Sequence, residues 1–133
     1  MPNYVAGIPS CVLVGELALC EVLCGQLPWP AFPERLAELA PRLWRQQNSM
    51  TLHTAETHAR RSDVVGVTAN MGRAIIMEAQ ARFAERRTWV LNEKSIVEKA
   101  GLSRAAAVLL AAGPSAPELM SSVDLLRRTL EMT

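Results

Sequence analysis

One carboxylate lies on an apolar helical stripe, where carboxylates are rarely found. Hydrophobic residues recur at helical spacing between Val64 and Arg87, and Glu78 falls among them. Burying this group is costly unless it is paired, hydrogen-bonded or hydrated. Either Glu78 pairs with Arg82, one turn further on, or caps a neighbouring helix, or it faces a pocket and orients a polar ligand group or a catalytic partner domain. The other stripe residues are Val67, Met71, Ala74, Ile75 and Ala81.

A second candidate site follows where this helix is expected to end. The segment from Arg86 to Lys94 mixes basic, aromatic and polar residues. It can be a helix C-terminus with favourable cations, followed by a turn. Alternatively, a corner there presents Asn92, Glu93 and Lys94 to a phosphate or to sugar hydroxyls, since lysine binds phosphate as a point charge. The predicted substrate- or partner-binding residues are therefore Glu78, Arg82, Asn92, Glu93 and Lys94.

No catalytic or metal-binding motif accompanies these residues. The glycine-rich phosphate-binding motifs and the G-x-S-x-G nucleophile elbow are absent from the sequence. His53 and His58 would point about 140° apart on one helix, so they cannot share a metal ion. Cys20 and Cys24 are expected to share a helix face, which is half a metal site at most, and Cys11 is also interpreted as structural. We expect no metal, no cofactor and no catalytic residue.

Composition limits the class of protein. The chain has 133 residues, of which 50% are hydrophobic and 20% charged, and its formal net charge is +1. This excludes a disordered tail, a collagen-like repeat and a disulfide miniprotein, and gives no general attraction to nucleic acid or an anionic membrane. The apolar run from Val12 to Leu23 is short and contains Glu16 and Glu21. With three reduced cysteines, these features favour a cytoplasmic protein with no membrane partner.

The first 33 residues divide into an apolar segment and a proline-rich loop. The segment from Ser10 to Leu23 allows a buried helix or a strand followed by a short helix, and we expect helix from about Val14. Three prolines between positions 28 and 33 then require a loop. Trp29 and Phe32 are expected to pin this loop to the body of the domain.

Two long helices are predicted in the middle of the chain. A short helix begins at Pro33 or Glu34, and Pro41 either kinks it or starts the next helix, which runs to about Arg60. Ser62 and Asp63 are natural N-cap residues for the helix from Val64 to about Arg87. A tight turn between the two helices predicts an antiparallel hairpin. Gly66 and Gly72 are tolerable in the second helix if another helix packs closely there.

The last third is expected to consist of short helices with clear boundaries. Ser95 with Glu98 and Ser115 with Glu118 have the spacing of capping boxes, and Ser103 can cap a helix between them. The predicted helices run from Asn92 or Ser95 to Ala100, from Arg104 to Ala112, and through Leu119 to Leu130. The prediction is one all-α domain over 1–133, a helical bundle built on the long antiparallel pair, with a short extended element at the N-terminus. Its parts are 1–32, 33–90 and 91–133.

The segment from Ser95 to Val108 has the spacing of a helix-turn-helix. Its second helix would read DNA, yet it offers Arg104 and then alanine, valine and leucine, which cannot address base edges. Ordinary helix packing is therefore favoured, and nucleic acid is not an expected partner.

The residues from Glu21 to Leu102 resemble the helical C-terminal portion of bacterial nucleotidyltransferase-domain proteins, relatives of the aminoglycoside and lincosamide nucleotidyltransferases. The resemblance covers roughly residues 15–105 and rests on three features: the pattern V-L-x-G-x-L-P before a proline-rich loop, the long helical pair, and W-V-L-N-E-K before V-E-K-A-G-L. It implies the helical half of such an enzyme, beside an α/β half that carries a Gly-Ser motif and paired aspartates for magnesium and a nucleoside triphosphate.

The chain departs from that family where catalysis would occur. It has no Gly-Ser dipeptide, and its aspartates, Asp63 and Asp124, are about sixty residues apart. Two-metal nucleotidyl transfer needs clustered carboxylates. The leading hypothesis is a non-catalytic substrate-side or partner-binding domain, inactive alone, whose partner is a separate catalytic domain or a small polar substrate.

Two further hypotheses stay open. One is a small homodimeric interaction protein, like a toxin–antitoxin partner, whose two copies pair through the apolar stripe of the helix that begins at Val64, called the Val64 stripe. The other is a helix-turn-helix regulator that binds DNA. The RNase members of related toxin–antitoxin pairs carry Arg four to six residues before His, a spacing that His53 and His58 lack.

Overall fold

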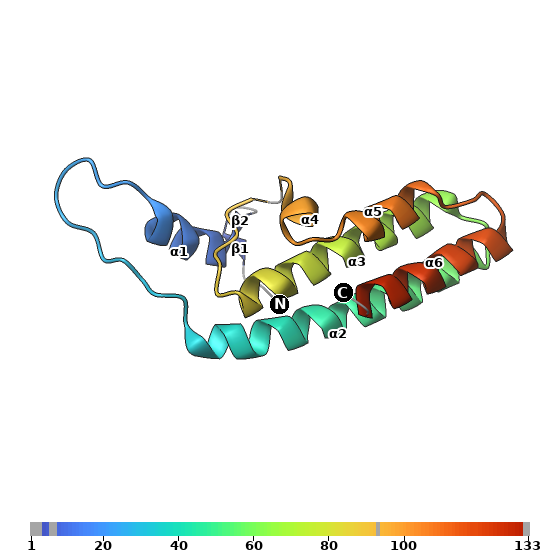
Figure 1. Ribbon diagram of the computed structural model, residues 1–133, viewed down its shortest axis with the longest axis horizontal. Coiled ribbons are helices and arrows are strands. Elements are labelled where there is room, and N and C mark those ends of the chain that lie inside the picture. The colour runs from blue at the N-terminus through green and yellow to red at the C-terminus, as the bar shows by residue number, and fades with distance from the viewer. Residues whose placement is uncertain (1–3, 6–7, 93, 132–133) are drawn as a thin grey trace.

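The computed structural model of the chain describes residues 4–5, 8–92 and 94–131. Two-residue strands pair antiparallel at the N-terminus, with Tyr4 opposite Pro9, and form the short extended element that the sequence predicts. The rest is helical, so the predicted all-α architecture is confirmed (Figure 1). The elements are β1 (Tyr4–Val5), β2 (Ile8–Pro9), α1 (Ser10–Leu19), α2 (Glu34–Ala59), α3 (Val64–Glu85), α4 (Ile96–Lys99), α5 (Ser103–Leu110) and α6 (Ala116–Glu131).

The antiparallel hairpin of α2 and α3 is the backbone of the fold, and the turn that joins them is fixed by Asp63. Its Oδ1 accepts from the backbone N–H of Gly66 at 2.9 Å, and its Oδ2 lies 2.7 Å from Nδ1 of His58. The N–H of Gly66 and then His58 hold the pKa of this carboxyl below its usual value. Asp63 is therefore the N-cap, as predicted, while Ser62 takes a left-handed conformation with φ of 55°.

The core lies where α5 and α6 cover one side of the hairpin (Figure 1). The apolar stripe of α3 is buried there, with Val67, Met71 and Ala74 fully inaccessible against Leu119 and Leu126 of α6. Removing this surface from water is the main stabilising contribution to the bundle. Since the chain's own helices cover the stripe, it is not available to pair two copies, and the proposed dimer through the Val64 stripe would require the bundle to open.

Two boundaries differ from the prediction near the N-terminus. Helix α1 begins at Ser10, not Val14, and ends at Leu19, so Cys20 and Cys24 lie beyond it and do not share a helix face. Helix α2 is one continuous helix with Pro41 inside it. It begins after Pro33, whose carbonyl accepts from the N–H groups of Leu36 and Ala37. Pro41 is the eighth residue of the helix, where it omits one backbone hydrogen bond but still packs as a buried residue.

The linker between α1 and α2, residues 20–33, is called the arm below. Figure 1 shows that it extends away from the hairpin. Phe32 is half-buried, with its ring centroid 4.7 Å from that of Trp89, so its predicted anchoring role is confirmed. The prediction for Trp29 is wrong, because this side chain is 69% exposed. Only the end of the arm next to α2 is therefore held by an aromatic contact.

The predicted helix caps of the last third are confirmed only in part. Ser95 is left-handed and makes no side-chain cap, and Ser103 lies inside α5 after Leu102, so neither acts as predicted. Glu118 accepts from the N–H of Ser115 at 3.0 Å, half of the expected capping box. The Ser115 hydroxyl bonds the same carboxylate instead of a backbone N–H. Among the described helices, none is both long and apolar enough to cross a membrane.

Candidate functional site

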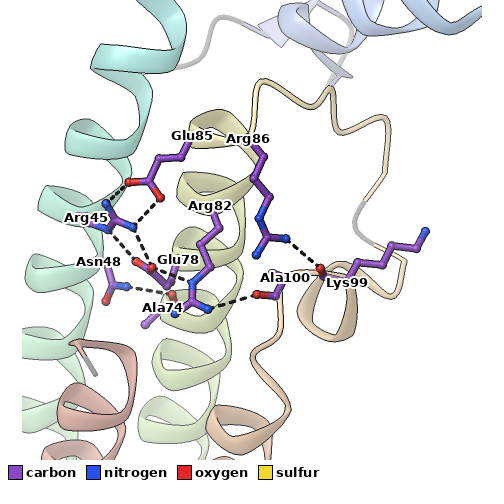
Figure 2. Close-up of polar contacts among 9 residues, drawn as sticks. All are labelled: Arg45, Asn48, Ala74, Glu78, Arg82, Glu85, Arg86, Lys99 and Ala100. Carbon is purple, nitrogen blue, oxygen red and sulfur yellow. Dashed lines mark hydrogen bonds and ion pairs between the residues drawn. The ribbon is translucent and has the colours of Figure 1, made fainter. Parts of the chain in front are cut away.

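Glu78 is buried, with 4% of its surface exposed, and bonds guanidinium groups from two helices. Arg82, one turn further along α3, donates from Nε to Oε1 at 3.1 Å. Arg45 of α2 donates from Nε to Oε2 and from Nη2 to Oε1, both at 3.1 Å. Such charge-assisted bonds, two of them parallel, make the burial of the carboxylate tolerable (Figure 2). The predicted Glu78–Arg82 pair is thus present, together with a second cation.

Arg45 bonds a second carboxylate as well. Its Nη1 and Nη2 donate to the oxygens of Glu85 at 2.5 and 3.1 Å. The hydrogen bond from Arg45 lowers the pKa of Glu85, and the two carboxylates raise the pKa of Arg45. Arg45, Glu78, Arg82 and Glu85 together are called the Glu78 cluster, and its four charges cancel.

The cluster extends to the end of α4. Arg82 donates from Nη1 to the carbonyl of Ala100 at 3.2 Å, and Arg86 donates from Nη1 to the carbonyl of Lys99 at 3.2 Å (Figure 2). These are carbonyls at a helix C-terminus, which lack partners within the helix. Side chains of α3 therefore hold both neighbouring elements in place: Glu78 bonds Arg45 of α2, and Arg82 and Arg86 bond the last carbonyls of α4.

A polar pocket opens beside the Glu78 cluster. It has a volume of about 530 Å³ and lies between α2, α3 and the end of α6. Arg127 adds a side chain from a third helix, α6, to the pocket wall. Its guanidinium pairs with the carboxylates of Glu56 and Asp124. Asn48, whose amide donates to the carbonyl of Ala74 at 3.1 Å, also lines it. Both hypotheses for Glu78 therefore describe part of its environment: it is ion-paired, and it borders a pocket.

The other predicted site residues lie elsewhere. Asn92 and Lys94 line a separate pocket of about 220 Å³ together with Trp89 and Ile96. The backbone N–H of Lys94 also donates to Oδ1 of Asn92 at 2.9 Å. Glu93 lies outside the described residues. The four predicted residues that the structure describes therefore do not form one site, because Glu78 and Arg82 border one pocket and Asn92 and Lys94 another.

Arg45 and Glu85 were not among the predicted site residues, yet a signal for Arg45 exists in the sequence. In an antiparallel helix pair, residues at equal distances from the turn lie opposite each other. Arg45 is 15 residues before Arg60, and Glu78 is 15 residues after Asp63. The predicted turn and the charge at Glu78 could therefore have identified its partner on the first helix.

The arrangement suits binding better than acid–base chemistry. Both Glu78 oxygens already accept hydrogen bonds from guanidinium groups, so the carboxylate is engaged within the fold, whereas a general base must lie within hydrogen-bond reach of the proton that it takes. Within residues 4–5, 8–92 and 94–131, no three His, Cys, Asp or Glu side chains come together in a way that could hold a metal ion.

The segment expected to resemble a helix-turn-helix has a first helix of only four residues, Ile96–Lys99. Gly101 takes a left-handed conformation, with φ of +76°, and ends this helix. The sequence predicts a helix end just before this glycine, at Ala100. The second helix, α5, buries Ala105 and packs on α3 and α6. Its exposed basic side chain is Arg104, so the surface gives no specific support for DNA recognition.

Comparison of the chain with protein-family models, with curated proteins and with solved structures finds no match.

Proposed function

We propose that this chain is a non-catalytic helical binding domain, the substrate-side or partner-binding unit of a nucleotidyltransferase-type system. The observation that carries the binding role is the buried carboxylate of Glu78 in the wall of an open polar pocket, fixed by guanidinium groups from two helices. Fixed charges of this kind can orient polar groups of a ligand with little reorganisation. The nucleotidyltransferase assignment is supported by the sequence resemblance that centres on residues 89–94.

The pocket favours a small polar ligand that carries an anionic group. Arg86 and Arg127 line it, and their bonds to Lys99, Glu56 and Asp124 use fewer donors than two guanidinium groups carry. Of the three carboxylates that line the pocket, those of Glu78 and Glu85 are engaged by Arg45, and Glu131 is the third, so the four lining arginines exceed the lining acids by one. A phosphate or carboxylate can therefore bind between Arg86 and Arg127 through charge-assisted hydrogen bonds.

The proposal assigns catalysis to a partner. Asp63 caps α3 beside His58, and Asp124 lies on α6 beside Arg127, so the two aspartates lie on different elements and bond different partners. In this arrangement the chain supplies the ligand-binding surface, and a separate catalytic domain supplies the magnesium-binding aspartates. The purified chain is then expected to show no nucleotidyl transfer with ATP and Mg²⁺, and transfer by the chain alone would contradict the proposal.

Binding can be tested by calorimetry with inorganic phosphate, AMP and ATP, each with and without Mg²⁺. At least one of these anions should bind, and Arg86→Gln should weaken it about tenfold, as expected for one charge-assisted bond. Arg104→Gln is the matched control, since this exposed arginine lies on α5 outside the pocket. Equal loss in both variants would indicate a general charge effect, and no binding of any probe would reject the anion site.

A further inference from the structure

The hairpin has a second open surface, on which α2 and α3 alone form the walls. A groove of about 910 Å³ runs between them, and Trp44, Met50, Ile76 and Met77 give it apolar walls. Met50 is 66% exposed. Of the described residues that line this groove, Arg73 alone is charged. This surface is called the open groove, and it is distinct from the polar pocket, which includes side chains of α6.

The part of the arm from Leu23 to Trp29 is a second exposed apolar surface. Leu23 is 92% exposed, and Leu27 and Trp29 are also exposed. The arm carries Glu21 and no lysine or arginine. The arm is therefore apolar with one negative charge, and the open groove is apolar with one positive charge. Exposed apolar patches of this kind mark interaction surfaces.

We propose that the arm of one copy docks in the open groove of a second copy, so that two reciprocal contacts close a dimer. The dimensions agree. The α2 wall from Trp44 to Thr54 is about 15 Å long, and an extended chain from Leu23 to Trp29 spans about 20 Å. In such a dimer, Leu23, Leu27 and Trp29 pack on Met50 and Ile76, and Glu21 approaches Arg73.

The arm can reach Trp44, about 15 Å along α2 at the near end of the groove of its own chain, but it cannot lie along the whole groove. It is tethered at both ends, at Leu19 of α1 and at Glu34 of α2, so it can extend by only about seven residues before it must return, roughly 23 Å when fully straight. Met50 is sixteen residues along α2, about 24 Å from the helix start. Three prolines further restrict the path. A second copy avoids this constraint, and a two-fold arrangement satisfies both grooves.

Sedimentation equilibrium of the full chain between 5 and 200 µM provides the first test. The expected result is a dimer whose fraction rises with concentration. A monomer throughout this range overturns the proposal, and it would still do so if a different protein were later found in the groove. The arm variant Leu23→Ser/Trp29→Ser and the groove variant Met50→Glu should each be monomeric. All three positions are exposed, so circular dichroism should show the fold retained. Leu110→Ser, at another leucine that is 88% exposed, is the matched control and should stay dimeric.

Mixing the two defective variants distinguishes this dimer from others. The groove variant has an intact arm and the arm variant has an intact groove, so their mixture should form a heterodimer through one good contact. Arm exchange would be overturned if the arm variant and the groove variant each remained dimeric on their own. It would also be overturned if their mixture stayed monomeric while the unmodified chain dimerises. Arg73→Glu should weaken the dimer about two- to fivefold, and adding Glu21→Arg should restore it. Arg86→Gln, in the polar pocket, should leave the dimer unchanged, so the two proposals fail separately.

Discussion

Arg45 of α2 and Glu78 of α3 meet across the hairpin through two parallel hydrogen bonds of 3.1 Å, although 33 residues separate them in the sequence. The pair is asymmetric, because the Glu78 side chain is almost fully buried and the Arg45 side chain is half exposed. Arg82 approaches the same carboxylate from within the core. Glu78 is therefore the member whose removal leaves a buried charge behind.

We expect Glu78→Ala to destabilise the chain by about 3 kcal/mol, because it removes a buried carboxylate that accepts a hydrogen bond from the buried guanidinium of Arg82. Urea denaturation at neutral pH measures this change in the free energy of unfolding. The double variant Glu78→Leu/Arg82→Met should lose less than Glu78→Ala, since it removes both charges and keeps apolar volume.

Glu85→Gln is the matched control for that series. Its carboxylate also bonds Arg45 but is exposed, so its removal should cost less than about 1 kcal/mol. Equal effects of Glu78→Ala and Glu85→Gln would show that burial does not decide the contribution of the Glu78 cluster.

The two glycines of α3 should respond oppositely to alanine. A Cβ at Gly72 would meet one atom within 4 Å, Cδ2 of Leu109 at 3.9 Å, which is ordinary contact. Gly72→Ala should therefore stabilise the chain by about 0.5–1 kcal/mol, through lower backbone entropy of the unfolded state. A Cβ at Gly66 would lie 2.6 Å from Oδ2 of Asp63 and still closer to the His58 ring, so Gly66→Ala should destabilise. Thermal melting of both variants tests the contrast, and a shift of the same sign in both would contradict it.

Most of the helical architecture could be predicted from periodicity and capping residues. Asp63 and the stripe around Met71 specify a helix and its buried face by local rules, so the hairpin and its core were accessible. The side chains of His58 and Asp63 lie close to Gly66, whereas Gly72 has room for a Cβ, and the sequence did not distinguish these two glycines. Boundaries depended on context: Pro41 is accommodated inside one helix, where a local rule left two alternatives open.

The candidate site was less accessible because it depends on contacts between elements. Glu78 and Arg82 are one turn apart on one helix, so their pairing follows from sequence spacing. Asn92 and Lys94 lie close in sequence to the end of α3, but the chain turns and gives them a different pocket. A cluster of charged residues in sequence does not fix on which side of a helix each side chain lies.

Two of the predicted helix caps, one confirmed and one wrong, can be compared by mutation. Asp63 accepts from the Gly66 N–H, whereas Ser103 follows Leu102 into the helix and caps nothing. Asp63→Ala should lower the melting temperature, and Ser103→Ala should leave it unchanged within about one degree. A lower melting temperature for Ser103→Ala would indicate that this serine caps α5 in solution.

Acid should destabilise the chain through carboxylates bonded to arginine. Hydrogen bonds from Arg45 and Arg127 lower the pKa values of Glu85 and Glu56 below the usual 4.5. The folded state therefore binds fewer protons than the unfolded state in this range. The stability contributed by these bonds is present above pH 4.5, and is lost as the pH falls through the lower folded-state pKa values.

Urea denaturation between pH 6 and pH 3 measures this dependence. The free energy of unfolding should fall with pH, and Glu56→Gln/Glu85→Gln should be less stable at pH 6 but lose less toward pH 3, so that the two curves converge. Arg45→Gln should flatten the curve in part, because it removes the cation that lowers the pKa of Glu85. Parallel curves for the double variant and the unmodified chain would mean that these two carboxylates do not control the acid sensitivity of the fold.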